Sequence, residues 1–98
     1  MALEIIVQNI NHVEQQRIGD DEKGSIYFLC AAQPTASVLR GVYRYGDTMF
    51  NTWQLKIMLE QTEGVTGETE EQRDALEQLR RLANIAIRSN GYLMFIGD

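Results

Sequence analysis

The chain has few of the residues on which many catalytic and metal sites depend. Its 98 residues include one cysteine, Cys30, and one histidine, His12. A single cysteine cannot form an internal disulfide, and inside the apolar stretch of residues 27–32 it is predicted to be a small buried hydrophobe. A nucleophilic thiol needs a neighbouring base, which here would have to be His12. These shortages argue against a catalytic cysteine and against a zinc-type site.

Long apolar runs and a surplus of basic residues are also missing. No apolar stretch approaches the roughly 20 residues of a membrane-spanning helix, and the first residues lack a signal-peptide pattern. We therefore expect a cytoplasmic protein without a membrane partner. The formal net charge is −5, and the nine Lys and Arg residues are scattered. Nucleic-acid binding needs clustered cations, so we expect no nucleic-acid partner; the acidity suits a solvated surface or a basic protein partner.

Recognisable catalytic, nucleotide and metal motifs are absent too. The acidic run Asp20, Asp21 and Glu22 lacks the spaced oxygen ligands of a calcium loop, so a solvated turn is predicted there. The segment around Gly41 and Gly46 has no phosphate-loop pattern. We expect no bound metal, no cofactor and no enzymatic activity.

The N-terminal half favours strands within a single domain of residues 1–98. Hydrophobic residues make up 44% of the chain and charged residues 23%, as in an ordinary small globular domain. Three segments with alternating or continuous apolar residues are predicted to be strands: 3–12, 25–32 and 38–45. The polar residues 11–23 between the first two strands are predicted to form a loop.

The C-terminal half favours two helices and a last strand. Asn51, followed three residues later by Gln54, is typical of a capping box and predicts a helix that runs to residue 63. A second helix is predicted over residues 68–88, where Leu76, Leu79, Leu82, Ala83 and Ala86 form one apolar stripe. Asn90 and Gly91 supply a left-handed stop, after which residues 92–96 are predicted to form a strand.

The predicted element order is β-β-β-α-α-β. Two amphipathic helices must bury their apolar stripes, and the large apolar surface available is one face of the sheet. The sequence therefore predicts an α+β fold: a two-layer sandwich of a mostly antiparallel sheet with a helical hairpin on one face.

The densest cluster of chemically distinctive residues spans residues 43–53. It places Tyr43, Arg44, Tyr45 and Asp47 where a strand pattern gives way to a helical one, and side chains at such a junction can converge on a partner. Two interpretations stay open. In one, Asp47 only fixes a turn by accepting backbone N–H groups or pairing with Arg44. In the other, the segment binds a protein partner. The candidate partner-binding residues are Tyr43, Arg44, Tyr45, Asp47 and Asn51, with Trp53 as a further contact or as a core residue like Phe50.

A resemblance involves two of these segments. Residues 45–54, with the sequence YGDTMFNTWQ, and residues 92–98, with the sequence YLMFIGD, resemble a set of small uncharacterised bacterial proteins. Those proteins carry a YGDTxFN segment before a helix and end in YLxFIGD. The resemblance covers residues 43–98 and implies a bacterial cytoplasmic α+β protein of no assigned activity. It also implies that the corner before the helix and the chain end lie close together.

Two classes of function follow from these observations. The first is a non-enzymatic protein-interaction module, and its sharpest version is an immunity-type inhibitor that blocks a basic toxin through surface complementarity. The alternative is a small-ligand-binding or structural subunit of a homo-oligomer. In that case the aromatic residues and Arg44 would close over a ligand or a second copy of the chain.

Overall fold

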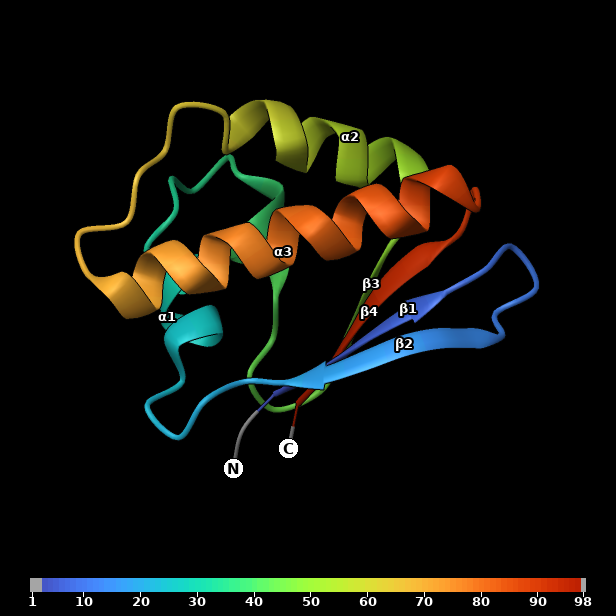
Figure 1. Ribbon diagram of the computed structural model, residues 1–98, viewed down its shortest axis with the longest axis horizontal. Helices are drawn as coiled ribbons and strands as arrows, with labels where there is room; N and C mark the ends of the chain where they lie inside the picture. The colour runs from blue at the N-terminus through green and yellow to red at the C-terminus, as the bar shows by residue number, and fades with distance from the viewer. Residues whose placement is uncertain (1–2, 98) are drawn as a thin grey trace.

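A four-stranded antiparallel sheet forms one layer of the protein. The structure is a computed structural model that describes residues 3–97 (Figure 1). The strand order across the sheet is β2-β1-β4-β3, and every neighbouring pair is antiparallel. The strands are β1 (Glu4–Gln8), β2 (Glu14–Gly19), β3 (Asp47–Phe50) and β4 (Tyr92–Ile96). The N-terminal and C-terminal strands are therefore the central pair, and β2 and β3 are the edges.

The helices form the second layer, on one face of this sheet (Figure 1). They are α1 (Ser25–Ala31), the 3-10 helix η1 (Val38–Gly41), α2 (Thr52–Gln61) and α3 (Glu70–Arg88). The long helix α3 packs against the central strands β1 and β4 and against both α1 and α2. The predicted α+β class is confirmed, with an antiparallel sheet and α2 and α3 on the same face.

Alternation along the central strands builds the core. Ile5 and Val7 of β1, and Leu93 and Phe95 of β4, are completely buried beneath the helices. The predicted apolar stripe of α3 covers them, and each of its members is buried: Leu76, Leu79, Leu82, Ala83 and Ala86. Burial of each large aliphatic or aromatic side chain stabilises the fold by about 1.5–3 kcal/mol. The sheet is therefore a well-packed scaffold that fixes the positions of the residues at its two ends.

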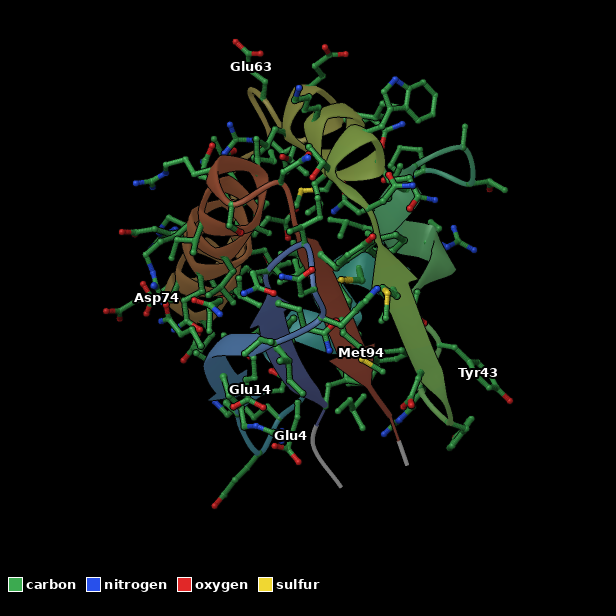
Figure 2. All side chains as sticks on the ribbon, turned by 90° about the vertical axis from the view of Figure 1, so that its right-hand side faces the viewer. Glu4, Glu14, Tyr43, Glu63, Asp74 and Met94 are labelled. Atoms are coloured by element: carbon green, nitrogen blue, oxygen red, sulfur yellow. The ribbon has the colours of Figure 1, made fainter. Side chains whose placement is uncertain are left out.

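The outer face of the sheet is closed in part by its own side chains. Ile6 is only 4% exposed although it points away from the core residues Ile5 and Val7. Arg17, the residue of β2 that is paired with Ile6, donates hydrogen bonds to Glu4 and Glu14. Figure 2 labels Glu4 on β1, Glu14 on β2 and Met94 on β4. Because the arginine bonds favour the ionised carboxylate, they lower the pKa of Glu14.

Predictions made for the C-terminal half are confirmed closely. The capping box is present, with Asn51 as the N-cap of α2. The second helix and the last strand occupy almost the predicted residues, and Asn90 adopts the left-handed conformation with φ 52°. These features depend on spacing within a few residues, which a sequence displays directly.

The predicted strand at residues 25–32 is wrong, because this segment forms helix α1. Its buried residues Ile26, Leu29 and Cys30 follow the spacing i, i+3, i+4, so one side of a helix serves the core. The acidic run before it is no mere solvated turn. Asp20 accepts backbone N–H groups of Ile26 at 2.8 Å and Tyr27 at 3.0 Å, which holds the first turn of the helix.

The predicted strand at residues 38–45 is wrong as well. Ser37 caps the 3-10 helix η1, and the buried residues Leu39 and Val42 are three positions apart. The sheet is instead completed by β2 and β3, which lie within the predicted polar loop and the predicted corner. Both are edge strands with weak apolar alternation: three of the six residues of β2 are exposed and polar, and Phe50 is the one buried residue of the four in β3.

Candidate functional site

The dense segment 43–53 is divided between the two ends of the sheet. Strand β3 lies inside it and pairs Asp47 with Ile96 and Phe50 with Leu93. At about 3.3 Å per residue, this strand carries the chain roughly 13 Å from Asp47 to Asn51. Tyr43, Arg44, Tyr45 and Asp47 therefore lie at one end of the sheet, while Asn51 and Trp53 lie at the other.

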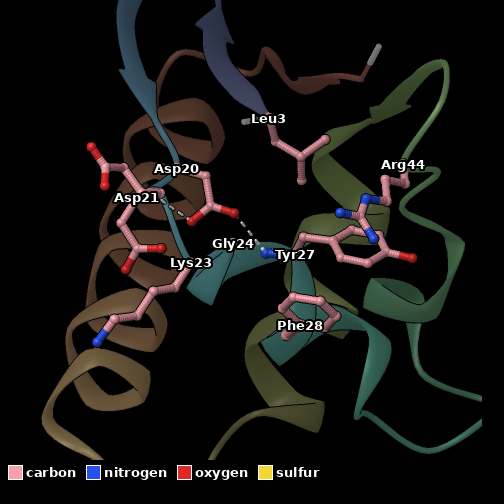
Figure 3. A pocket seen from close by; sticks show the side chains of 9 residues that line it. Leu3, Asp20, Asp21, Lys23, Gly24, Tyr27, Phe28 and Arg44 are labelled. Atoms are coloured by element: carbon pink, nitrogen blue, oxygen red, sulfur yellow. Dashed lines mark hydrogen bonds between the residues drawn. The ribbon is translucent and has the colours of Figure 1, made fainter. Parts of the chain in front are cut away.

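Arg44 is the centre of the first end. Its guanidinium carbon lies 5.2 Å from the ring centroid of Tyr27, 5.7 Å from that of Phe28 and 6.0 Å from that of Tyr45. At these distances a cation is attracted to the face of an aromatic ring. Figure 3 shows the guanidinium above the Tyr27 ring. We name the group Tyr27, Phe28, Tyr43, Arg44 and Tyr45 the arginine end.

Two members of the arginine end were missed in the sequence. Tyr27 and Phe28 were assigned to a buried strand, but on helix α1 Phe28 is 54% exposed. The signal that reveals them is the helical spacing of Ile26, Leu29 and Cys30, which turns Phe28 to solvent and leaves Tyr27 half-buried at the margin of the core.

The two exposed tyrosines are held by a tight turn. Tyr43 and Tyr45 are 58% and 64% exposed, and their rings meet edge to face at a centroid distance of 6.0 Å. The backbone N–H of Tyr43 donates to the Thr48 hydroxyl at 3.0 Å. A Cβ at Gly46 would lie 2.8 Å from the Tyr43 ring, so the turn is closely packed. Tyr43 projects away from the body of the molecule (Figure 2).

An acidic loop lies next to this aromatic group. A cavity of about 360 Å³ is lined by Tyr27, Phe28 and Arg44 and by residues 20–24, which include three carboxylates and Lys23. Figure 3 shows Asp20, Asp21 and Lys23 across from Arg44. Asp21 accepts the backbone N–H of Ser25 at 2.8 Å and also its hydroxyl. These Ser25 bonds favour the ionised carboxylate and lower the pKa of Asp21.

The acidic surface continues onto helix α3. Glu71 and Asp74 line a second hollow together with Asp20 and Asp21. Lys23 approaches Glu71 at 3.8 Å, and both side chains are largely exposed. A backbone N–H bond, and then the charge of Lys23, lower the pKa of Glu71. Carboxylates therefore outnumber cations in this region, which favours a basic group in any partner that reaches it.

Asp47 and Asn51 have different surroundings. Asp47 is an exposed residue of β3, and within residues 3–97 its carboxylate has no hydrogen bond or ion pair. The turn bonds and the Arg44 pair considered for Asp47 are absent from that range, whereas the predicted N-cap role of Asn51 is confirmed. The Asn51 side chain accepts the Gln54 N–H at 2.9 Å, and the Asn51 N–H donates to the Gln54 side chain at 2.9 Å.

The second end of the sheet also displays apolar residues. Trp53 is 70% exposed, whereas Phe50 is 5% exposed and packs edge to face against Phe95, so the core interpretation holds for Phe50 and is wrong for Trp53. Ile10, 54% exposed, and Tyr92 line a hollow with Trp53. We name Ile10, Val13, Trp53 and Tyr92 the tryptophan end. Its members come from separate segments, so sequence reasoning did not group them.

The cysteine and the possible metal ligands do not form a reactive site in the described residues. Burial, and then the charge of Asp20, raise the pKa of the Cys30 thiol to about 12, so this thiol is protonated at neutral pH. Over residues 3–97, no three His, Cys, Asp or Glu side chains are grouped as metal ligands. None of the helices in that range is both long and apolar enough to cross a bilayer.

Comparisons with protein-family models, curated proteins and solved structures found no match to this chain. The resemblance to the small bacterial proteins therefore stays a prediction. Its structural implication is confirmed for the described residues, because β3 and β4, which lie in the two resembling segments, are paired neighbours. Asp98, the last residue of the second segment, lies outside the described residues.

Proposed function

We propose that the chain is a non-enzymatic, cytoplasmic protein-interaction module whose contact surface is the arginine end. The observation that supports this function is the guanidinium of Arg44, which lies across aromatic rings from α1 and from its own turn while Tyr43 and Tyr45 stay largely exposed. Asp47 flanks this group on β3. Arginine and tyrosine are among the residues that contribute most to protein interfaces.

The backbone segments that carry these aromatic residues are held in place before any partner binds, which also supports the proposal. The turn that carries Tyr43 is held by the Thr48 hydroxyl, and α1, which carries Tyr27, is held by Asp20. Side chains that are already ordered lose less entropy on binding, so more of the contact energy becomes affinity. Among the candidates of the sequence analysis, Tyr43, Arg44 and Tyr45 are therefore the anchors. Asn51 lies at the far end and serves α2.

The partner that best fits this surface is a basic protein. Asp20, Asp21 and Glu22 share a cavity with Arg44, and Glu71 and Asp74 extend the acidic surface. Complementary charge speeds association and selects against acidic partners. An immunity-type inhibitor of a basic bacterial toxin has this chemistry and is the sharpest form of the proposal.

A second candidate function rests on the cavity itself. Its volume of about 360 Å³ is within the range of small-ligand sites, and such sites combine aromatic walls with a few placed polar groups. In this form, Arg44 and the aromatic residues would close over a small molecule in a ligand-binding or structural subunit of a homo-oligomer.

The test is a capture experiment from the native cell followed by calorimetry with the purified partner. Arg44→Ala and Tyr45→Ala should each weaken binding by about 2 kcal/mol and change the free energy of unfolding by less than about 1 kcal/mol. Trp53→Ala is the matched control, since it removes an exposed aromatic residue at the other end and should leave this affinity unchanged. A partner whose affinity survives both Arg44→Ala and Tyr45→Ala would refute the assignment.

A further inference from the structure

The tryptophan end has no part in the proposed contact surface, yet it is the other place where large apolar side chains gather in solvent. Trp53 is 70% exposed, Val13 55% and Ile10 54%. They come from the first turn of α2 and from the turn between β1 and β2. Single exposed apolar residues are ordinary, but an exposed tryptophan that shares a groove with the exposed Ile10 is typical of an interaction surface.

The hairpin turn that displays Ile10 and Val13 is fixed by local bonds. The Asn9 side chain accepts the N–H groups of Asn11 at 2.9 Å and Val13 at 3.0 Å. His12 takes the left-handed conformation, with φ 63°, and its ring stacks on Tyr92 at a centroid distance of 4.2 Å. The two apolar side chains are therefore presented on an ordered backbone.

The helix start that displays Trp53 is tied to the same frame. The Thr52 hydroxyl donates to the carbonyl oxygen of Gly91 at 3.0 Å. Gly91 in turn lies against the backbone of β1, where a Cβ would overlap the carbonyl oxygen of Gln8. The end of β1, the turn before β4 and the first turn of α2 thus form one rigid platform, which keeps the entropy cost of association low.

A groove lies directly beside the projecting Trp53. It has a volume of about 230 Å³, with Ile10, Trp53 and Tyr92 as apolar walls and Asn51, Thr52 and Asn90 as polar rim. A projection and a groove in the same patch suit a two-fold interface, because each copy supplies both halves of the contact.

The lack of charge in the groove indicates which kind of partner it fits. None of the residues that line this groove is charged, whereas the chain as a whole has a formal net charge of −5. A basic partner would gain more at the acidic surface of the arginine end. Two copies of an acidic chain repel each other least where an uncharged patch meets its own copy.

We propose that the tryptophan end is a self-association surface, where a second copy of this chain binds and Trp53 of each copy enters the groove beside Ile10 and Tyr92 of the other. The interface is isologous, and Trp53 is its main anchor. This inference is independent of the proposed function, since it uses residues at the opposite end of the sheet and needs no foreign partner.

The purified chain tests it by sedimentation equilibrium over a concentration series. The wild type should form a reversible dimer, and Trp53→Ala and Ile10→Asp should each raise the dimer Kd at least about tenfold. Both side chains are exposed, so the thermal midpoint should stay within a few degrees. Tyr45→Ala is the matched control and should leave the dimer Kd unchanged. Trp53 is the single tryptophan, so its fluorescence should shift to shorter wavelength as the dimer forms.

Four results would overturn the inference. One is a wild-type chain that stays monomeric up to about 1 mM. Another is a dimer whose Kd is the same in Trp53→Ala. The third is a dimer lost in Tyr45→Ala and kept in Trp53→Ala, which would move the interface to the arginine end. A foreign protein that needs Trp53, found with a monomeric chain, also counts against it. Failure of the basic-partner proposal leaves these measurements untouched.

Discussion

The two ends of the sheet both present exposed aromatic side chains, but they differ in charge. At the arginine end, a guanidinium lies on aromatic rings beside an acidic loop. At the tryptophan end, the groove is lined by uncharged residues. The first arrangement favours recognition that depends on charge complementarity, and the second favours burial of apolar area. The two proposed kinds of recognition are therefore separated by the length of β3.

A glycine at each end of β4 brings the neighbouring backbone into close contact. Gly91 precedes the strand and lies against the carbonyl of Gln8, while Gly97 follows it and lies against the carbonyl of Arg44. Gly97 also donates its N–H to the carbonyl of Gly46 at 2.9 Å. The positions of Trp53 and of Arg44 thus depend on two separate backbone contacts.

The largest expected effect comes from adding a methyl group at these two close backbone contacts. Gly91→Ala and Gly97→Ala should each lower the free energy of unfolding by about 2–3 kcal/mol, because the added methyl group would overlap backbone atoms that cannot rotate away. Urea unfolding measures this. Gly19→Ala is the control, since a Cβ there has no atom within 4 Å. In buffer without urea, where the variants stay folded, Gly91→Ala should weaken self-association and Gly97→Ala should weaken partner binding. The reverse pattern would contradict the difference proposed between the two ends.

The next effect concerns the acidic loop alone. Asp20→Ala removes the acceptor for the N–H groups of Ile26 and Tyr27 and should lower the free energy of unfolding by about 1–2 kcal/mol. Because α1 carries two rings of the arginine end, partner binding should weaken while the dimer persists. Glu22→Ala, in the same loop, is the control and should change stability by less than about 0.5 kcal/mol. Equal losses in the two variants would contradict the capping role.

A smaller effect should appear in acid. The Ser25 bonds lower the pKa of Asp21 in the folded chain, so its stabilising contribution is complete above its unfolded pKa of about 3.9 and is lost as pH falls through the folded pKa. Thermal unfolding of the wild type and of Asp21→Asn between about pH 2 and pH 6 measures it. The difference between their midpoints should be constant above about pH 4 and shrink below it; a constant difference throughout would contradict the assignment.

The sequence predicts well what is decided within a few residues. The capping box of Asn51 and the apolar stripe of α3 follow from spacing alone, and both are confirmed. The strand prediction for residues 25–32 is wrong because a short apolar run is compatible with a buried strand as well as with a helix. One contact that favours the helix comes from Asp20, which accepts the N–H groups of Ile26 and Tyr27, six and seven residues further along the chain.

The candidate site was predictable to the same extent. Tyr43, Arg44 and Tyr45 are adjacent in the sequence and stay together in the structure. Their association with Tyr27 and Phe28 depends on α1 being a helix, so it could not be foreseen once that segment was assigned as a strand. The tryptophan end joins Ile10, Trp53 and Tyr92, which only the completed sheet brings together.

The smallest expected effect is also the most direct test of the difference between the two ends. Raising the salt concentration from about 0.1 M to about 1 M shortens the screening length from about 10 Å to about 3 Å. Binding of a basic partner at the arginine end should weaken several-fold, because part of its attraction comes from the exposed carboxylates of the acidic loop. The dimer Kd should stay the same or fall slightly, since its groove has no charged lining and salt reduces the repulsion between two acidic chains. Calorimetry and sedimentation in matched buffers give both values. If the two affinities weaken together, charge does not distinguish the two ends, and self-association must use a charged surface.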